Sequence, residues 1–315
     1  MNKSILALLI LLIVTASQAA FKDIGWSVRA SGMGKAFAAV ADDSSGLLVN
    51  PAGISKLEYR ETSLMYSQLF TGLEDVNIKL NSFTYVQPAG KLGAFGVAWT
   101  SFDTNSIYRE TMYSLSYADA FNGLLGSWRN LYLGLNIKYL EHSYTLDRYS
   151  QDDPVFANGV SKGNFTVDLG SIFEPQFESC PGLSFGLALR NVTQPDIGLA
   201  TSDIVPFEGQ AGAAYFFTGG SKLQDITFAL DLLYRNQEWG SLSDKLTACL
   251  GAETWVFRKM LGLRAGVNSR EASVGASFQS AVIGDFGLRF DYAFNFPFYL
   301  PDTTGTHRAS LSVRF

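Results

Sequence analysis

Apolar and polar side chains alternate residue by residue near the end of the chain. Between residues 286 and 296, large apolar side chains occupy every second position, and charged, polar or small residues stand between them. Residues 306–315 repeat the alternation and stop on Phe315. Successive side chains of a β-strand point to opposite faces, so the pattern predicts strands with one apolar and one polar face. A soluble sheet that packs one face on a core would show it too.

The number and length of such segments separate a soluble sheet from a membrane barrel. Fourteen candidate strands follow residue 56: 58–69, 76–87, 91–102, 108–118, 130–142, 164–174, 182–192, 206–217, 225–235, 244–256, 260–268, 271–279, 284–296 and 306–315. Each is about as long as the roughly 9–11 residues with which a tilted strand crosses a bilayer. An even strand number brings both ends of the sheet to one side, and in lipid the sheet must close on itself. We therefore predict an all-β fold, a 14-stranded antiparallel transmembrane β-barrel over residues 57–315.

The start of the chain has the features of a secretory signal peptide. Lys3 precedes an apolar stretch at 5–14, and residues 17–19 form a small-x-small cleavage site. The apolar stretch is shorter than the about 20 residues that a membrane-spanning helix needs. We therefore predict that residues 1–19 are removed and that the protein reaches the outer membrane of a Gram-negative cell, with both termini periplasmic. Export also counts against the alternatives of a soluble β-sandwich or β-solenoid.

The composition agrees with a barrel and excludes several other functions. Charged residues make up 17% of the chain, against about 25% in soluble globular proteins. The net charge of −5 provides no basic surface for nucleic acid. Neither His142 nor His307 lies in a catalytic motif, and no cluster has metal-ligand spacing, so we predict no enzyme, no metal site and no cofactor. The sequence leaves open whether Cys180 and Cys249 form a disulfide.

The polar faces of the predicted strands carry both charges in equal number. Alternation places seven cations inward: Lys138, Arg190, Arg235, Arg264, Arg289, Arg308 and Arg314. It also places seven carboxylates inward: Asp168, Glu208, Asp231, Glu253, Glu271, Asp285 and Asp291. Balanced charge favours a paired network around a narrow or plugged lumen, since a wide selective pore would carry one sign in excess. Separate, solvated side chains in the lumen are the alternative.

Residues 20–56 do not have the strand pattern. Residues 28–41 are rich in alanine, and their C-terminal half can form a helix before residues 42–46 end it. Residues 50–53, Asn-Pro-Ala-Gly, have turn chemistry. A short apolar helix at the mouth of a barrel can bury itself inside, so we predict an N-terminal helical hatch over residues 20–56. Its candidate gating residues are Gly32, Met33, Gly34, Asp42, Asp43, Asn50, Pro51, Ala52 and Gly53.

The same segment resembles a known family of membrane proteins. Residues 29–46 and 50–53 resemble the N-terminal signature of the PorV/PorQ outer-membrane proteins, which belong with the FadL-type transporters of hydrophobic compounds. The ending at 306–315 is also similar to these proteins. The resemblance implies a 14-stranded barrel with a hatch in the lumen, in which residues 50–52 correspond to the family's hatch motif. It also supports Phe315 as an assembly signal for the barrel assembly machinery.

The resemblance implies more than one function. FadL proper is longer, with extended outer loops that form a hydrophobic groove, whereas the longest outer loop predicted here, 143–163, is polar. We expect passage of small hydrophobic molecules across the outer membrane through a hatch-gated lumen. The alternative is a non-transporting partner of a type IX secretion system, and a structural or general porin role is third. The expected partners are outer-membrane lipid, the barrel assembly machinery, and either hydrophobic small molecules or secretion-translocon proteins.

Overall fold

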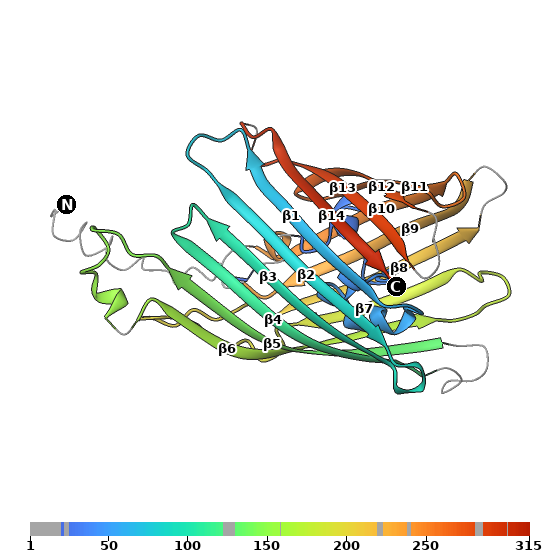
Figure 1. The fold of residues 1–315 in the computed structure, drawn as a ribbon, viewed down its shortest axis with the longest axis horizontal. Helices are drawn as coiled ribbons and strands as arrows, with labels where there is room; N and C mark the ends of the chain where they lie inside the picture. Colours follow the sequence, from blue (N-terminus) through green and yellow to red (C-terminus); the bar gives the residue numbers. More distant parts are fainter. Residues whose placement is uncertain are drawn as a thin grey trace.

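The chain forms a closed β-barrel with a folded segment inside it (Figure 1). The computed structural model describes residues 20–21, 25–121, 130–157, 159–218, 223–237, 241–280, 286–300 and 302–315. The predicted signal peptide, residues 1–19, and the predicted inward charge Asp285 lie outside the described residues.

Antiparallel strands make the wall, each paired with its neighbours in sequence, and β14 closes the barrel on β1. Their bounds are β1 Glu61–Thr71, β2 Ile78–Pro88, β3 Ala94–Thr104, β4 Tyr108–Ala120, β5 Asn130–Tyr144, β6 Ser161–Glu174, β7 Leu183–Arg190, β8 Glu208–Thr218, β9 Leu223–Arg235, β10 Leu246–Val256, β11 Leu261–Asn268, β12 Glu271–Gln279, β13 Gly287–Pro297 and β14 Gly305–Arg314. Short helices lie in three connections: η3 Gly90–Leu92, η4 Pro154–Phe156 and α3 Leu242–Lys245. The predicted 14-stranded antiparallel barrel is confirmed, with strand ends that differ by at most three residues from the predicted ones.

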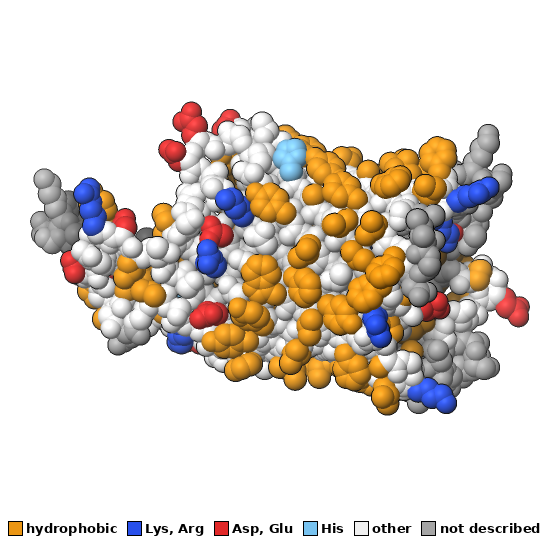
Figure 2. All heavy atoms as spheres, in the orientation of Figure 1, with side chains coloured by type: hydrophobic (Ala, Val, Ile, Leu, Met, Phe, Trp, Pro, Cys, Tyr) orange, Lys and Arg blue, Asp and Glu red, His pale blue; other side chains and the backbone are white. Residues whose placement is uncertain are grey.

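Side-chain alternation decides which face of the wall each residue takes. Along β13, Leu288 and Phe290 are 50% and 49% exposed, whereas Arg289 and Asp291 are 3% and 1% exposed. In Figure 2 apolar side chains cover the middle of the visible wall, and the charged side chains gather toward its two ends. The barrel therefore has an apolar outer surface and buries charges inside, as the sequence pattern predicts.

Pairing in the wall is shortest between β6 and β7. The register of these two strands covers only residues 169–173 of β6. Residues 191–207 then continue along β6 through Val192, whose N–H donates to Val167 O at 3.0 Å, and they fold inward to bury Ile197 completely. This connection therefore completes the wall and also contributes to the interior.

Residues 25–56 lie inside the barrel. They form the α-helix α2 (Val28–Gly32) and two 3-10 helices, η1 (Ser44–Leu48) and η2 (Pro51–Lys56), joined by turns. Because α2 packs against β11 to β14 and η2 against β2 to β6, the segment contacts opposite sides of the wall. Figure 1 shows it in blue within the ring of strands. No helix of the described ranges is long and apolar enough to span a membrane.

The inner segment is less helical than the sequence predicts. We expect a helix in the alanine-rich C-terminal half of residues 28–41, but α2 occupies the first part and residues 38–40 form a turn. The wall provides the reason, because Asp231 Oδ2 accepts the N–H groups of Phe37 (2.9 Å) and Ala38 (2.8 Å). The wall thus satisfies two N–H groups, and the Val40 and Ala41 N–H groups bond to Phe37 O in a single turn, so the prediction of a helix there is wrong.

Phe21 lies toward the end of the barrel opposite Phe315. Phe21 N–H donates to Glu110 Oε2 at 3.0 Å, close to the start of β4. At the opposite end, Arg60 and Phe315 exchange backbone hydrogen bonds of 3.1 and 3.0 Å. The two ends of the sheet thus share one side, as an even strand number requires, whereas Phe21 lies near the other.

Candidate functional site in the barrel lumen

One side of the lumen holds a buried network of charges around Arg29 of α2. The Arg29 guanidinium binds both carboxylate oxygens of Glu253 on β10, with N–O distances of 2.8 and 2.6 Å. It also pairs with Asp42 and lies 3.4 Å from Asp43 Oδ2. A bidentate guanidinium–carboxylate contact is among the stronger hydrogen-bonded pairs in proteins. Arg29 therefore fastens the inner segment to the wall.

Asp43 is a second anchor between the inner segment and the wall. Its carboxylate accepts from Arg289 Nη2 on β13 at 3.2 Å and from the Gly46 N–H at 3.1 Å, where it caps η1. Burial raises the pKa of Asp43, but the Arg289 and Arg29 guanidinium groups outweigh burial and lower the pKa to about 2. Asp43 is therefore ionised at neutral pH.

The inward charges of the wall are paired around these anchors. The pairs are Arg264 with Glu253 and with Asp291 (3.3 Å), Arg289 with Asp291 (2.9 Å), Arg190 with Glu208 (3.0 Å), Arg235 with Glu208 (2.6 Å), Lys138 with Asp168 (2.7 Å) and Arg314 with Glu61 (2.7 Å). Arg308 instead donates to Gly25 O at 2.9 Å, and Asp231 accepts the two backbone N–H groups described above. Removing one partner of such a buried pair typically costs about 3–5 kcal/mol. Through Arg29 and Asp43, which pair with Glu253 and Arg289 of the wall, this network opposes displacement of the inner segment.

Gly32, Met33 and Gly34 lie where the inner segment touches β10 to β12. Gly34 has a φ of +62°, and a Cβ there would lie 2.6 Å from Val267 N, so the position requires glycine. The Gly34 N–H donates to Ser273 Oγ at 3.0 Å, and Met33 is completely buried. These predicted gating residues bring the two backbones into direct contact.

The corner at Asn50, Pro51 and Ala52 lies at the start of η2. Asn50 Oδ1 accepts the Ala52 N–H at 3.2 Å, and Asn50 Nδ2 donates to Ser171 O on β6 at 3.0 Å. One side chain thus caps the helix and attaches it to the wall. A Cβ on Gly53 would lie 1.7 Å from a backbone oxygen of the inner segment, so this position also excludes a side chain.

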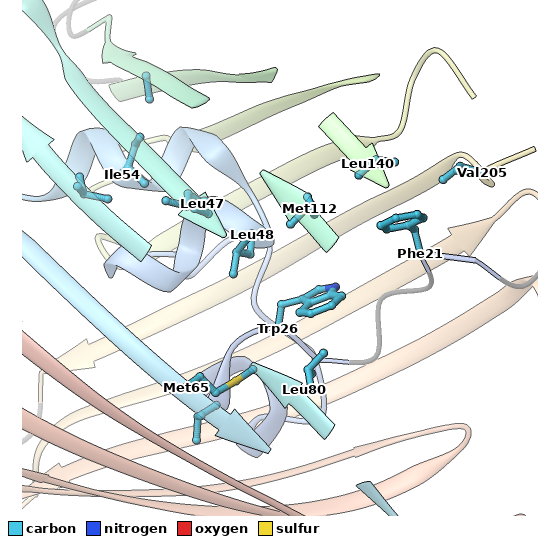
Figure 3. Packing of buried hydrophobic residues seen from close by; sticks show 14 of the residues in the cluster. Phe21, Trp26, Leu47, Leu48, Ile54, Met65, Leu80, Met112, Leu140 and Val205 are labelled. Carbon is cyan, nitrogen blue, oxygen red and sulfur yellow. The ribbon is translucent and has the colours of Figure 1, made fainter. Parts of the chain in front are cut away.

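The other side of the lumen holds an apolar cluster. Phe21 and Trp26 pack there with residues of η1 and η2, of the inner faces of β1 to β5, and of the 191–207 connection. The cluster includes Leu47, Leu48, Ile54, Met65, Leu69, Leu80, Met112, Leu140, Ile197 and Val205. In Figure 3 the Phe21 ring lies near Leu140 and Val205, with Trp26 beside it. The lumen therefore holds this apolar cluster as well as the charge network, and the inner faces of β1 to β5 also carry buried polar side chains such as Ser82, Thr100 and Glu110.

A small cavity of about 30 Å³ lies where these two sides meet. Its apolar lining consists of Phe21, Trp26, Leu48, Met112 and Leu140. Its polar lining consists of Ser114, Asn136, Lys138, Asp168, Arg190, Asn191 and Glu208. Two of the lining atoms, Ser114 Oγ and Asn136 Oδ1, are buried and have no hydrogen-bond partner among the described residues. The cavity thus combines an apolar wall with unused hydrogen-bonding groups.

A larger hollow of about 580 Å³ lies on the outside of the wall across β8 to β11. Small side chains such as Ala252 and Ala265 form its floor, and Phe228 and Leu250 are among the large ones that border it. On the inner side of these strands, Gly251 and its neighbours touch the inner segment. The hollow and the lumen cavity share no lining residue.

The histidines and cysteines have no constellation around them that indicates catalysis. His142 is 2% exposed and packs edge-on against the Tyr108 ring, and His307 lies on the outer face of β14. In the ranges described, no group of three or more His, Cys, Asp or Glu could hold a metal ion. Cys180 is exposed, Cys249 is buried, and both are free thiols.

Two features of the lumen are missed by sequence analysis. Phe21 and Trp26 follow the predicted cleavage site, and two large aromatic residues just before the alanine-rich stretch are the signal that could have marked them. Glu61 accepts from Arg314 at 2.7 Å, but alternation alone does not mark it because the inner face of β1 carries mainly serine, methionine and leucine.

Comparisons with known proteins support the fold. No protein-family model and no curated protein matches the chain. Among solved structures, the Ralstonia pickettii toluene transporter TbuX superposes with a TM-score of 0.57 at 12% identity, covering 94% of this chain and 99% of that one. The CymD monoaromatic hydrocarbon channel gives 0.55 at 13% identity, covering 94% and 97%. A Pseudomonas aeruginosa FadL homologue gives 0.54 at 13% identity, covering 92% and 98%. The chain therefore has the 14-stranded barrel fold that these channels share.

Proposed function

We propose that this protein is an outer-membrane channel that passes small hydrophobic molecules through its lumen, with residues 20–56 as the gate. The observation that carries the proposal is the apolar cluster in the lumen, where Phe21 and Trp26 pack with residues of the inner segment and of β1 to β5. An apolar lining offers a route to molecules that water-filled pores exclude. The apolar outer surface of the barrel supports placement in a membrane.

The comparisons support the same class of cargo. Two of the similar barrels are named for toluene and for monoaromatic hydrocarbons.

In this proposal the charge network around Arg29 and Asp43 holds the gate closed, and Asn50, Pro51 and Ala52 form the rigid corner between gate and first strand. The end of the barrel that holds Phe315 would face the periplasm, and Phe315 would be the signal for the barrel assembly machinery.

Uptake by intact cells tests this function. A Gram-negative host lacking its own hydrocarbon channels should take up a radiolabelled monoaromatic compound several-fold faster when it expresses the protein. Uptake of a small hydrophilic sugar is the control and should not change. Equal acceleration of both compounds would indicate a general porin, and acceleration of neither would contradict transport.

A role as a non-transporting partner of type IX secretion is the second candidate. It rests on the resemblance of residues 29–46 and 50–53 to the PorV/PorQ signature. Mass spectrometry of what co-purifies from outer membranes separates the two roles. Translocon proteins in stoichiometric amounts would favour secretion, whereas lipids and apolar compounds would favour transport.

A further inference from the structure

The lumen cavity contains two buried polar atoms that the described chain leaves unsatisfied. Ser114 and Asn136 are 3% and 1% exposed and both line the cavity. Asn136 Nδ2 donates to Leu47 O at 3.0 Å and to Asp168 Oδ2 at 3.1 Å, but Asn136 Oδ1 and Ser114 Oγ have no partner. A buried polar group without a hydrogen-bond partner destabilises the folded protein. The pair therefore points to a group that arrives from outside the chain.

The positions of the two side chains define what that group must be. Ser114 is paired with Lys138 across β4 and β5, and Ser116 is paired with Asn136, so Ser114 and Asn136 are diagonal neighbours on the inner face. Diagonal neighbours have Cα atoms about 7–8 Å apart, which lets a single oxygen between them reach both side chains. A hydroxyl can donate to Asn136 Oδ1 while it accepts from Ser114 Oγ.

The apolar wall of the cavity fits a single ring. The Phe21 side chain occupies the space beside the cavity, against Leu140 and Val205 in Figure 3. At about 30 Å³, the remaining cavity has room for water but not for a ring while Phe21 is in place. The chain's own phenyl ring thus occupies the volume that an aromatic ligand would need.

The charges around the cavity disfavour an anionic ligand. Lys138 pairs with Asp168 at 2.7 Å, and Arg190 pairs with Glu208 at 3.0 Å. A carboxylate would have to break one of these buried pairs, and this would leave an uncompensated charge. A neutral hydroxyl requires no such exchange.

We infer that the lumen site binds a neutral molecule with one apolar ring and one hydroxyl group, a phenol by chemical class. Its ring replaces the Phe21 side chain, and its hydroxyl joins Ser114 to Asn136. The inference rests on the proposed function and narrows its substrate class from apolar compounds in general to hydroxylated aromatic ones.

Binding of two fluorinated probes tests the inference. The affinities of 4-fluorophenol and 4-fluorotoluene are measured by ¹⁹F NMR with the purified full chain in detergent, corrected for partition into protein-free micelles. The measurement is repeated in Phe21→Ala, which vacates the ring position and should tighten binding of both probes. Two hydrogen bonds, each contributing about fivefold, should together give fluorophenol an advantage of about 25-fold.

Two serine variants test whether Ser114 is the residue that binds the hydroxyl group of the probe. Ser114→Ala should reduce the fluorophenol affinity about fivefold, as expected for loss of one hydrogen bond, and leave fluorotoluene unchanged. Ser63→Ala is the control, because Ser63 is on the inner face of β1, is 7% exposed and does not line the cavity. Equal affinities for the two probes, or equal effects of the two serine variants, would overturn the inference and leave water as the only occupant. If neither probe binds, even in Phe21→Ala, the proposed passage through this side of the lumen fails as well.

Discussion

At the residue scale, the adjacent carboxylates Asp42 and Asp43 of the inner segment differ in burial and in the arginine that each one binds. The Asp43 side chain is completely buried and binds Arg289, whereas the Asp42 side chain is 34% exposed and binds Arg29. Asp43→Asn should lower the free energy of unfolding by about 2 kcal/mol, because it weakens charge-assisted bonds in a buried site. Asp42→Asn, the matched control, should cost less than about 1 kcal/mol. Urea unfolding in lipid vesicles measures both, and equal losses would contradict the anchoring role of Asp43.

The same residue gives the stability a dependence on pH. The pKa of Asp43 is lowered from 3.8 to about 2 in the folded protein. A lowered carboxyl pKa contributes stability above the unfolded-state value, and that contribution is lost as the pH falls through the folded-state value. Between about pH 4 and pH 2 the intact protein should therefore lose more stability than Asp43→Asn. Parallel curves for the two proteins over this window would show that Asp43 is not the group responsible.

At the scale of the single element, β13 offers a test of register. Phe290 is 49% exposed on the outer face, and Ala293 is completely buried on the inner face. Phe290→Arg should cost about 2–4 kcal/mol if it lies near the middle of the bilayer. Ala293→Arg should be destabilising for a different reason, since no space exists for the side chain beside α2. Tyr149→Arg in the 145–160 loop, at a side chain 77% exposed, should be neutral. Equal tolerance at Phe290 and Tyr149 in a reversible folding assay would contradict the barrel in lipid.

The strands are predictable from the sequence because period-two alternation is a local signal that tertiary contacts do not reverse. Even β2, in which apolar and polar residues do not separate onto two faces, forms at the predicted position. The structure of residues 36–41 is not predictable in this way, because the N–H groups of Phe37 and Ala38 bond to Asp231, nearly 200 positions later in the chain. For the same reason, alternation identifies the inward charges of the lumen but not which of them meet. The inward path of residues 191–207 also lacks a periodic signal.

At the scale of the whole molecule, the orientation in the membrane follows from which connections lie at each end. Residues 147–153 lie beyond β5, at the end opposite Phe315, whereas residues 88–90 lie in the turn between β2 and β3 at the same end as Phe315. We expect an epitope tag within 147–153 to be labelled on intact cells and one at 88–90 to be labelled only after permeabilisation. Reversed labelling would place the C-terminal end outside and contradict the proposed orientation.

The central claim is that the inner segment closes the barrel. Planar-bilayer recording tests it most directly, by comparing the intact protein with a variant that keeps its signal peptide but lacks residues 24–50. The intact protein should be nearly silent to small ions, because residues 25–56 contact opposite sides of the wall. The deletion should insert and conduct in large, steady steps. Equal conductance of the two proteins would show that the segment does not seal the lumen, and the account of a gated passage would be wrong.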